Sequence, residues 1–186
     1  MNAPVAARNL CIVVCGAGPA PHVGVLVGLA QSGGWTVRVV ATPAALDFID
    51  TAALERQSGS PVRSSFADPH QPRTRSRDDA IIIAPATFNM INKLASGIND
   101  TYALNVVAEA IGRQTPVVVL PFINTALAAR RPFATAVEDL RGEGVHVILG
   151  PSQWMPHAPG TGDRHIKDYP WQATLDALPP NGVAAQ

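Results

Sequence analysis

The segment of residues 79–100 constrains the fold of this chain most strongly, because it joins an apolar run, a proline turn and a helix start. Residues 80–84 read Ala-Ile-Ile-Ile-Ala, a non-alternating run that is typical of a central parallel strand covered on both faces. The run stops at Pro85, and Thr87 can cap the helix that follows. The first N–H groups of such a helix lack partners within it and point beyond the end of the strand. The segment therefore predicts a ligand site.

Short apolar runs alternate with helical patterns along the chain. We predict strands at residues 10–15, 36–41, 80–84, 116–120 and 145–149. We predict helices at residues 22–31, 43–48, 89–96, 102–111, 132–141 and 171–178. This repetition indicates right-handed βαβ crossovers, and so an α/β fold: a three-layer, doubly wound parallel sheet of the Rossmann or flavodoxin-like type.

Length and composition favour a single domain over residues 1–186, with a core at 9–150 and a flap and C-terminal helix at 151–180. The 186 residues are 47% hydrophobic, which is enough for one substantial core. The formal net charge is zero, so nucleic acids and anionic membrane surfaces are not expected partners. Gly and Pro interrupt the apolar stretch of residues 10–30, and the N-terminus lacks a signal-peptide pattern. We expect a cytoplasmic protein.

Two further features complete the organisation of the chain. Residues 57–77 are rich in Ser, Pro and Arg and predict a long loop, with one short strand near residues 61–64.

Cys11 and Cys15 lie four residues apart in a predicted strand, so their side chains share a face. We expect them to be buried thiols rather than metal ligands. The scattered histidines show no metal-ligand spacing, and we predict no metal site.

In a doubly wound sheet, ligands bind beyond the carboxyl ends of the strands. Gly16-Ala17-Gly18 lacks the three-glycine spacing of dinucleotide sites, so a structural turn and a phosphate loop are both open interpretations. The second strand ends without the acidic residue expected for NAD, and Thr42 there suits a mononucleotide better. Asn124, after the fourth strand, either caps the next helix or recognises substrate.

The central segment resembles a known family. Residues 79–90 (DAIIIAPATFNM) and 93–100 (KLASGIND) are similar to the signature of the homo-oligomeric flavin-containing cysteine decarboxylases. That family includes phosphopantothenoylcysteine decarboxylase and the peptidyl-cysteine decarboxylases of lantibiotic synthesis. Residues 37–49 resemble its second strand and helix, and the likeness spans about residues 10–150.

The resemblance implies an FMN site and two catalytic residues. The implied FMN contacts are Gly16, Ala17, Gly18, Thr42, Pro43, Ala44, Thr87, Phe88, Asn89, Met90 and, through its backbone, Phe122. Asn124 matches the family's substrate-binding Asn. The family's catalytic His falls at Gln71, and His70 lies one position away, so His70 is the candidate base.

Departures from the family pattern bear on the reaction. The Pro-x-Met-Asn-x-x-Met-Trp motif keeps Pro121 and Asn124 but has Ile123, Leu127 and Ala128 where the family has Met, Met and Trp. The flap also lacks the Cys of the phosphopantothenoylcysteine enzymes, which is compatible with the peptidyl-cysteine branch. The resemblance thus implies FMN-dependent oxidative decarboxylation of a cysteine-like, peptide or small-molecule carboxylate by a homotrimer or a homododecamer. The alternatives are an FMN-binding protein without this activity and a flavin prenyltransferase, for which Arg130 and Arg131 are the nearby basic residues.

Overall fold

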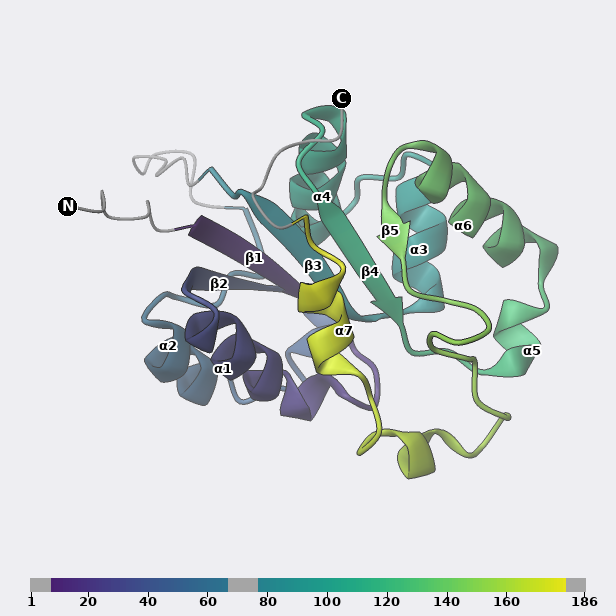
Figure 1. The fold of residues 1–186 in the computed structure, drawn as a ribbon, viewed down its shortest axis with the longest axis horizontal. Helices are drawn as coiled ribbons and strands as arrows, with labels where there is room; N and C mark the ends of the chain where they lie inside the picture. Colours follow the sequence, from purple (N-terminus) through teal and green to yellow (C-terminus); the bar gives the residue numbers. More distant parts are fainter. Residues whose placement is uncertain (1–7, 67–76, 180–186) are drawn as a thin grey trace.

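A five-stranded parallel sheet organises the chain, with strand order β2-β1-β3-β4-β5 (Figure 1). The structure is a computed structural model that describes residues 8–66 and 77–179. The strands are β1 (Arg8–Val14), β2 (Trp35–Ala41), β3 (Ala80–Ala86), β4 (Val117–Pro121) and β5 (His146–Val147). This order is the flavodoxin-like one, so the predicted fold class is confirmed.

Helices cover both faces of the sheet. One face carries α1 (Gly24–Ser32), α2 (Thr51–Ser58) and α7 (Trp171–Asp176). The other carries α3 (Phe88–Ala95), α4 (Tyr102–Gly112) and α6 (Arg131–Gly142). The short α5 (Thr125–Ala128) and the 3₁₀ turns Ala20–His22, Pro43–Ala45 and Gly162–His165 lie in the connections. No helix in the described ranges is long and apolar enough to cross a membrane.

The apolar run of β1 is buried on both faces because its side chains alternate between the two cores. Leu10, Ile12 and Val14 pack toward α1, whereas Cys11 and Val13 pack toward the helices of the opposite face. β3 is buried along its whole length. Continuous apolar runs therefore mark strands that lie between two helical layers.

The sequence interpretation was wrong in the region after β2. The helix predicted at 43–48 is only the 3₁₀ turn Pro43–Ala45, and α2 forms instead. Asp50 caps α2 through a hydrogen bond from the Ala53 N–H to Oδ1 (2.9 Å), and Gly59 ends it at φ 71°. Only Leu54 of α2 is buried, so the helix has almost no apolar stripe that a sequence pattern would reveal. The strand predicted near 61–64 is a single bridge, with the Ala41 N–H donating to the Arg63 carbonyl (2.8 Å).

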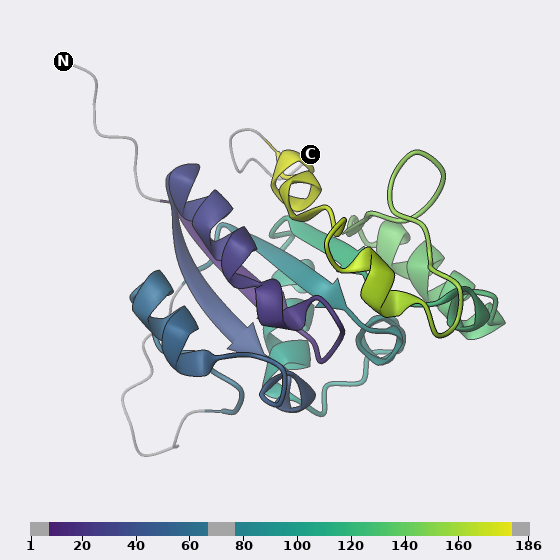
Figure 2. The same ribbon diagram turned by 90° about the horizontal axis from the view of Figure 1, so that it is seen from below.

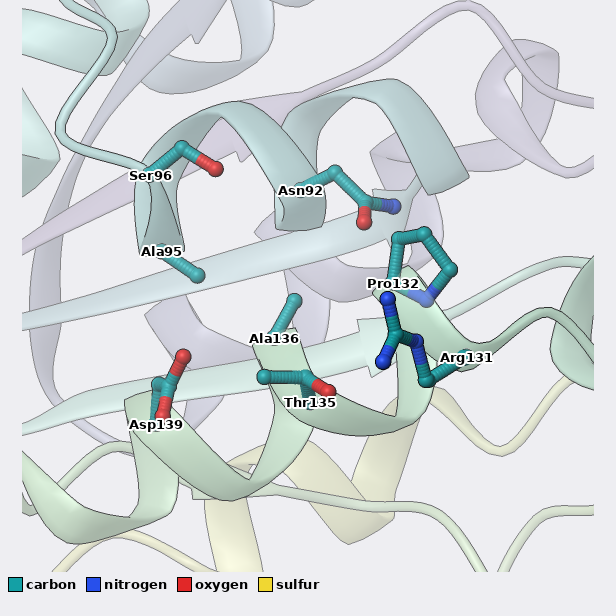
Figure 3. Close-up of a pocket in the computed structure, with 8 residues that line it drawn as sticks. All are labelled: Asn92, Ala95, Ser96, Arg131, Pro132, Thr135, Ala136 and Asp139. Atoms are coloured by element: carbon teal, nitrogen blue, oxygen red, sulfur yellow. The ribbon is translucent and has the colours of Figure 1, made fainter.

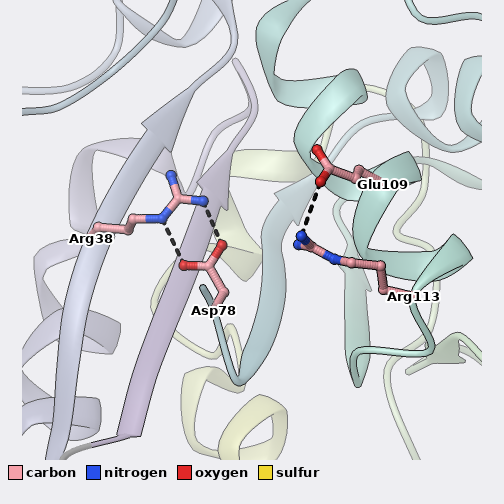
Figure 4. Close-up of polar contacts among 4 residues, drawn as sticks. All are labelled: Arg38, Asp78, Glu109 and Arg113. Atoms are coloured by element: carbon pink, nitrogen blue, oxygen red, sulfur yellow. Dashed lines mark hydrogen bonds and ion pairs between the residues drawn. The ribbon is translucent and has the colours of Figure 1, made fainter. Parts of the chain in front are cut away.

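A buried ion pair ties β2 to the start of β3 across β1 (Figure 4). Arg38 donates from Nε to Asp78 Oδ1 (2.7 Å) and from Nη2 to Oδ2 (2.5 Å), a two-pronged geometry. Burial lowers the pKa of Arg38, but the Asp78 carboxylate and the nearby Cys11 raise it by more, so this pKa lies above its ordinary value. The Asp78 side chain is only 4% exposed, so the carboxylate depends on Arg38 for its stability.

Both cysteines are buried free thiols, as predicted. Burial raises the pKa of Cys11 to about 12 and that of Cys15 to about 11; hydrogen bonds from Thr87 lower the latter only in part. Thiolate is the reactive form of cysteine. We therefore expect iodoacetamide at pH 8 to leave both thiols unlabelled in the native protein and to label both after denaturation in guanidinium, as counted by intact mass. Rapid labelling of either cysteine in the native protein would contradict this burial.

Candidate functional site

Four loops meet at the carboxyl edge of the sheet, because parallel strands all end on the same side (Figures 1 and 2). Backbone hydrogen bonds join them. The Cys15 N–H donates to the Pro85 carbonyl (3.1 Å), and the Thr42 N–H donates to the Val14 carbonyl (2.9 Å). The Phe122 N–H donates to the carbonyl of Ala86 (2.8 Å). Segments far apart in sequence thus form one continuous rim.

The rim presents backbone N–H groups that have no partner in the described part of the chain. They belong to Gly16, Ala17 and Gly18 after β1 and to Phe88 and Asn89 in the first turn of α3. Thr87 caps α3 as predicted, and its Oγ1 accepts the Met90 N–H (3.2 Å). N–H groups on a glycine turn and at a helix start are suited to an anionic oxygen, without an Arg or Lys clamp.

Gly16 lets the loops after β1 and β2 touch. A Cβ placed on Gly16 would lie 2.7 Å from the Ala44 carbonyl oxygen and 3.0 Å from its carbon. No side chain is tolerated at such distances from backbone atoms. This contact brings Thr42 and Pro43 to the same rim as the glycine turn, which places two of the predicted cofactor-binding groups side by side.

The aromatic ring of Phe122 lies over Gly18. A Cβ on Gly18 would be 3.1 Å from Phe122 Cε1 and 3.2 Å from Ile166 Cδ1. The ring is therefore seated between the β1 loop and the C-terminal segment, a contact that the backbone role expected for Phe122 did not include.

The residues after β3 divide between the rim and the core. Asn89 is exposed. The Phe88 ring stacks on Phe133 of α6 (5.8 Å between centroids, 17° between planes), and Met90 is buried with its N–H occupied by Thr87. A ligand can therefore reach the N–H groups of Phe88 and Asn89 and the Asn89 side chain. A contact between the ligand and Met90 stays a prediction.

Asn124 is the N-cap of α5, which confirms one of the two interpretations open from its sequence. Its Oδ1 accepts the Leu127 N–H (2.9 Å). Its Nδ2 makes no hydrogen bond with any described residue, so this amide still has two N–H donors for a ligand. Capping and substrate recognition are therefore compatible at this residue.

Residues 151–169, predicted as a flap, pack against the Asn124 loop through an aromatic cluster. The Thr125 N–H donates to the His157 carbonyl (2.8 Å), and the His157 N–H donates to the Ile123 carbonyl (3.2 Å). The cluster comprises Phe122, Trp154, His157, His165, Tyr169 and Trp171. The Tyr169 hydroxyl donates to the buried Leu120 carbonyl (2.6 Å), and burial raises the pKa of this phenol. From its sequence context His157 is expected only at the surface or in the core, because no pattern in this Pro-rich segment relates it to Asn124.

A separate open hollow lies between α3 and α6, with a volume of about 420 Å³ (Figure 3). Asn92 of α3 and Ser96, which follows this helix, line one side, and Arg131, Thr135 and Asp139 line it from α6. It contains none of the residues predicted to bind FMN or to act in catalysis, although Arg131, named for the prenyltransferase alternative, lines it. His70, the candidate base, and Gln71 lie outside the described residues, so the structure neither brings His70 to the rim nor separates it from the rim.

Comparisons with known proteins agree with this architecture. The coenzyme A biosynthesis bifunctional protein CoaBC of Mycolicibacterium smegmatis is 29% identical over 151 residues, which are 79% of this chain and 36% of that protein. CoaBC of Escherichia coli is 29% identical over 153 residues, 79% of this chain and 37% of the relative. The chain thus spans little more than a third of the length of these relatives.

Solved structures share the fold. The FMN-dependent cysteine decarboxylase SpaF superposes with a TM-score of 0.67 and 25% identity, covering 90% of this chain and 97% of that one. TvaF, from thioviridamide biosynthesis, superposes with a TM-score of 0.67 at 22% identity. The superposition covers 91% of this chain and 96% of TvaF. The family model described as Flavoprotein matches residues 4–169. This chain belongs to the Flavoprotein family.

Proposed function

We propose that this chain binds FMN at the rim and uses it in the oxidative decarboxylation of a cysteine-like carboxylate. The observation that carries the proposal is the set of N–H groups at Gly16, Ala17, Gly18, Phe88 and Asn89 that have no partner among the described residues, together with the Asn124 amide on the loop after β4. Such groups hold a phosphate or carboxylate by hydrogen bonds and the helix dipole. The name of SpaF, an FMN-dependent cysteine decarboxylase, supports the same cofactor and substrate class.

The proposed mechanism assigns binding and orientation to the chain. The N–H groups of the β1 loop and of the start of α3 would hold the cofactor phosphate, and Thr42, Pro43 and Ala44 of the β2 loop would complete its site. When bound, FMN supplies the two-electron oxidation of the thiol-bearing carbon. Asn124 Nδ2 donates to the substrate carboxylate and orients it, and the Phe122 ring with the flap excludes water. His70 is proposed as the base that accepts a substrate proton.

The cofactor and the substrate class are tested together. Protein reconstituted with FMN should be yellow and should show saturable quenching of flavin fluorescence. Incubation with peptides that end in cysteine should give a product lighter by carbon dioxide plus two hydrogens. Absence of FMN uptake would contradict the cofactor proposal, whereas uptake without any such product across a peptide panel would contradict the reaction.

Replacement of His70 tests the base. We expect His70→Asn to lower turnover by about 10²- to 10⁴-fold while FMN affinity stays unchanged, since only proton transfer is lost. His146→Asn is the matched control, because His146 is exposed on β5 and belongs to no part of the proposed site. Full activity of the His70 variant would remove this residue from the mechanism.

We further propose that the chain is one domain over residues 1–186, that it lies in the cytoplasm, and that it forms a homo-oligomer. The oligomer is a trimer or a dodecamer built of four trimers. Leu46 and Phe48, next to the rim residue Ala44, are 40% and 44% exposed, and apolar side chains of this size favour a partner surface. The free buried thiols suit a reducing compartment. Light scattering coupled to gel filtration should give three or twelve times the mass of one chain, and a monomer would contradict the assembly.

A further inference from the structure

His157 is paired through its backbone with Asn124, the residue proposed to hold the substrate carboxylate. Asn124 and His157 are partners in a parallel bridge, and their segments are joined by the two backbone hydrogen bonds of 2.8 and 3.2 Å. Partners in such a bridge lie about 4.8 Å apart. The His157 backbone is thus held at a fixed distance from Asn124, although His157 lies 33 positions further along the sequence.

The His157 ring is oriented by contacts on several sides. It packs on the Phe122 ring (4.9 Å between centroids) and stacks on His165 (5.7 Å, 18° between planes). Gly162 leaves room for its edge, because a Cβ there would lie 3.2 Å from Cε1 and 3.4 Å from Nε2. The side chain is only partly buried, so it is accessible to a ligand.

One ring nitrogen is occupied. His157 Nδ1 lies 3.0 Å from the Ala158 carbonyl oxygen, which only accepts hydrogen bonds. In the neutral ring the hydrogen is therefore on Nδ1, and Nε2 keeps a lone pair. Nε2 has no hydrogen-bond partner in the described part of the chain. Because the His157 backbone is bridged to that of Asn124, an oriented acceptor on His157 is suited to a substrate whose donor lies next to the carboxylate proposed to bind Asn124.

We propose that His157 is a substrate-binding residue whose Nε2 accepts a hydrogen bond from the donor nearest the substrate carboxylate. In an acylated cysteine that donor is either the thiol S–H or the amide N–H. The inference rests on the proposed function, since it takes the cysteine-like carboxylate as the ligand of Asn124. It assigns recognition to His157 and leaves the oxidation to the cofactor.

The test measures substrate affinity without turnover. FMN-loaded protein is kept reduced with dithionite, so it cannot oxidise the thiol, and a peptide ending in cysteine is titrated calorimetrically at pH 7.5. We expect His157→Phe, which keeps the ring packing, to weaken the peptide Kd by about 3- to 10-fold, the usual effect of one lost hydrogen bond. His157→Gln restores an acceptor and should bind within about 2-fold of wild type. His146→Phe is the matched control and should bind as wild type does.

Two peptide analogues identify the donor. One ends in S-methylcysteine and lacks the S–H, and the other has an ester in place of the last amide and lacks the N–H. The analogue without the relevant donor should bind wild type and His157→Phe equally. The inference is overturned if His157→Phe binds the cysteine peptide as tightly as wild type does. It is also overturned if His157→Phe weakens the binding of both analogues as much as it weakens the binding of the cysteine peptide. If wild type itself does not bind the peptide, the proposed substrate class fails and the inference fails with it, an outcome visible before any variant is made.

Discussion

Replacement of Arg38 by Met is expected to lower the free energy of unfolding by about 3–5 kcal/mol, because it strands the Asp78 carboxylate inside the protein. Asp78 is 4% exposed, and each of its carboxylate oxygens accepts a hydrogen bond from Arg38. Once the guanidinium is gone, the buried carboxylate has no partner left among the described residues. Urea unfolding followed by circular dichroism gives the difference directly.

Two further variants separate this effect from a general loss of charge. Arg113→Met breaks an exposed pair with Glu109, whose side chains are 47% and 60% exposed, and should change stability by no more than about 0.5 kcal/mol (Figure 4). Arg38→Met combined with Asp78→Leu removes both buried charges and should recover most of the loss. An Arg38→Met protein as stable as wild type would show that Asp78 is not held as the structure has it.

Gly16→Ala is the second large effect expected, and it acts on cofactor binding. The new Cβ would lie 2.7 Å from the Ala44 carbonyl oxygen, so the loops after β1 and β2 must separate. Overpacking of this kind costs about 1–3 kcal/mol. Since the glycine turn is part of the proposed phosphate site, we expect FMN affinity to fall by roughly 5- to 150-fold, measured by fluorescence titration.

Gly28→Ala is the matched control for this substitution. Gly28 lies inside α1, where a Cβ would meet only Gln57 Nε2, at 3.4 Å. Alanine is the better helix former by about 1 kcal/mol, so this variant should be as stable as wild type or more stable, with unchanged FMN affinity. Equal FMN affinities for the two variants would refute the role proposed for the Gly16 turn.

The strands could be predicted because burial on both faces leaves an unbroken apolar run, as in β1 and β3. The cap at Thr87 could be predicted because capping is a local hydrogen bond between residues that are close in sequence. α2 was missed because a helix that buries a single leucine carries no apolar stripe. The sequence pattern therefore identified elements wherever burial is periodic or continuous, and failed where an element is held by its caps.

In the candidate site, too, some features could be predicted from the sequence and others depend on tertiary packing. The sequence by itself determined the small and hydroxyl-bearing residues that follow each strand, and the parallel fold brings Gly16, Thr42 and Thr87 to one edge because all the strands end there. Only the tertiary structure decided that Gly16 touches Ala44, that Phe122 covers Gly18, and that His157 is bridged to Asn124. Those contacts join residues far apart in the chain, and their distances depend on how loops pack rather than on any local preference.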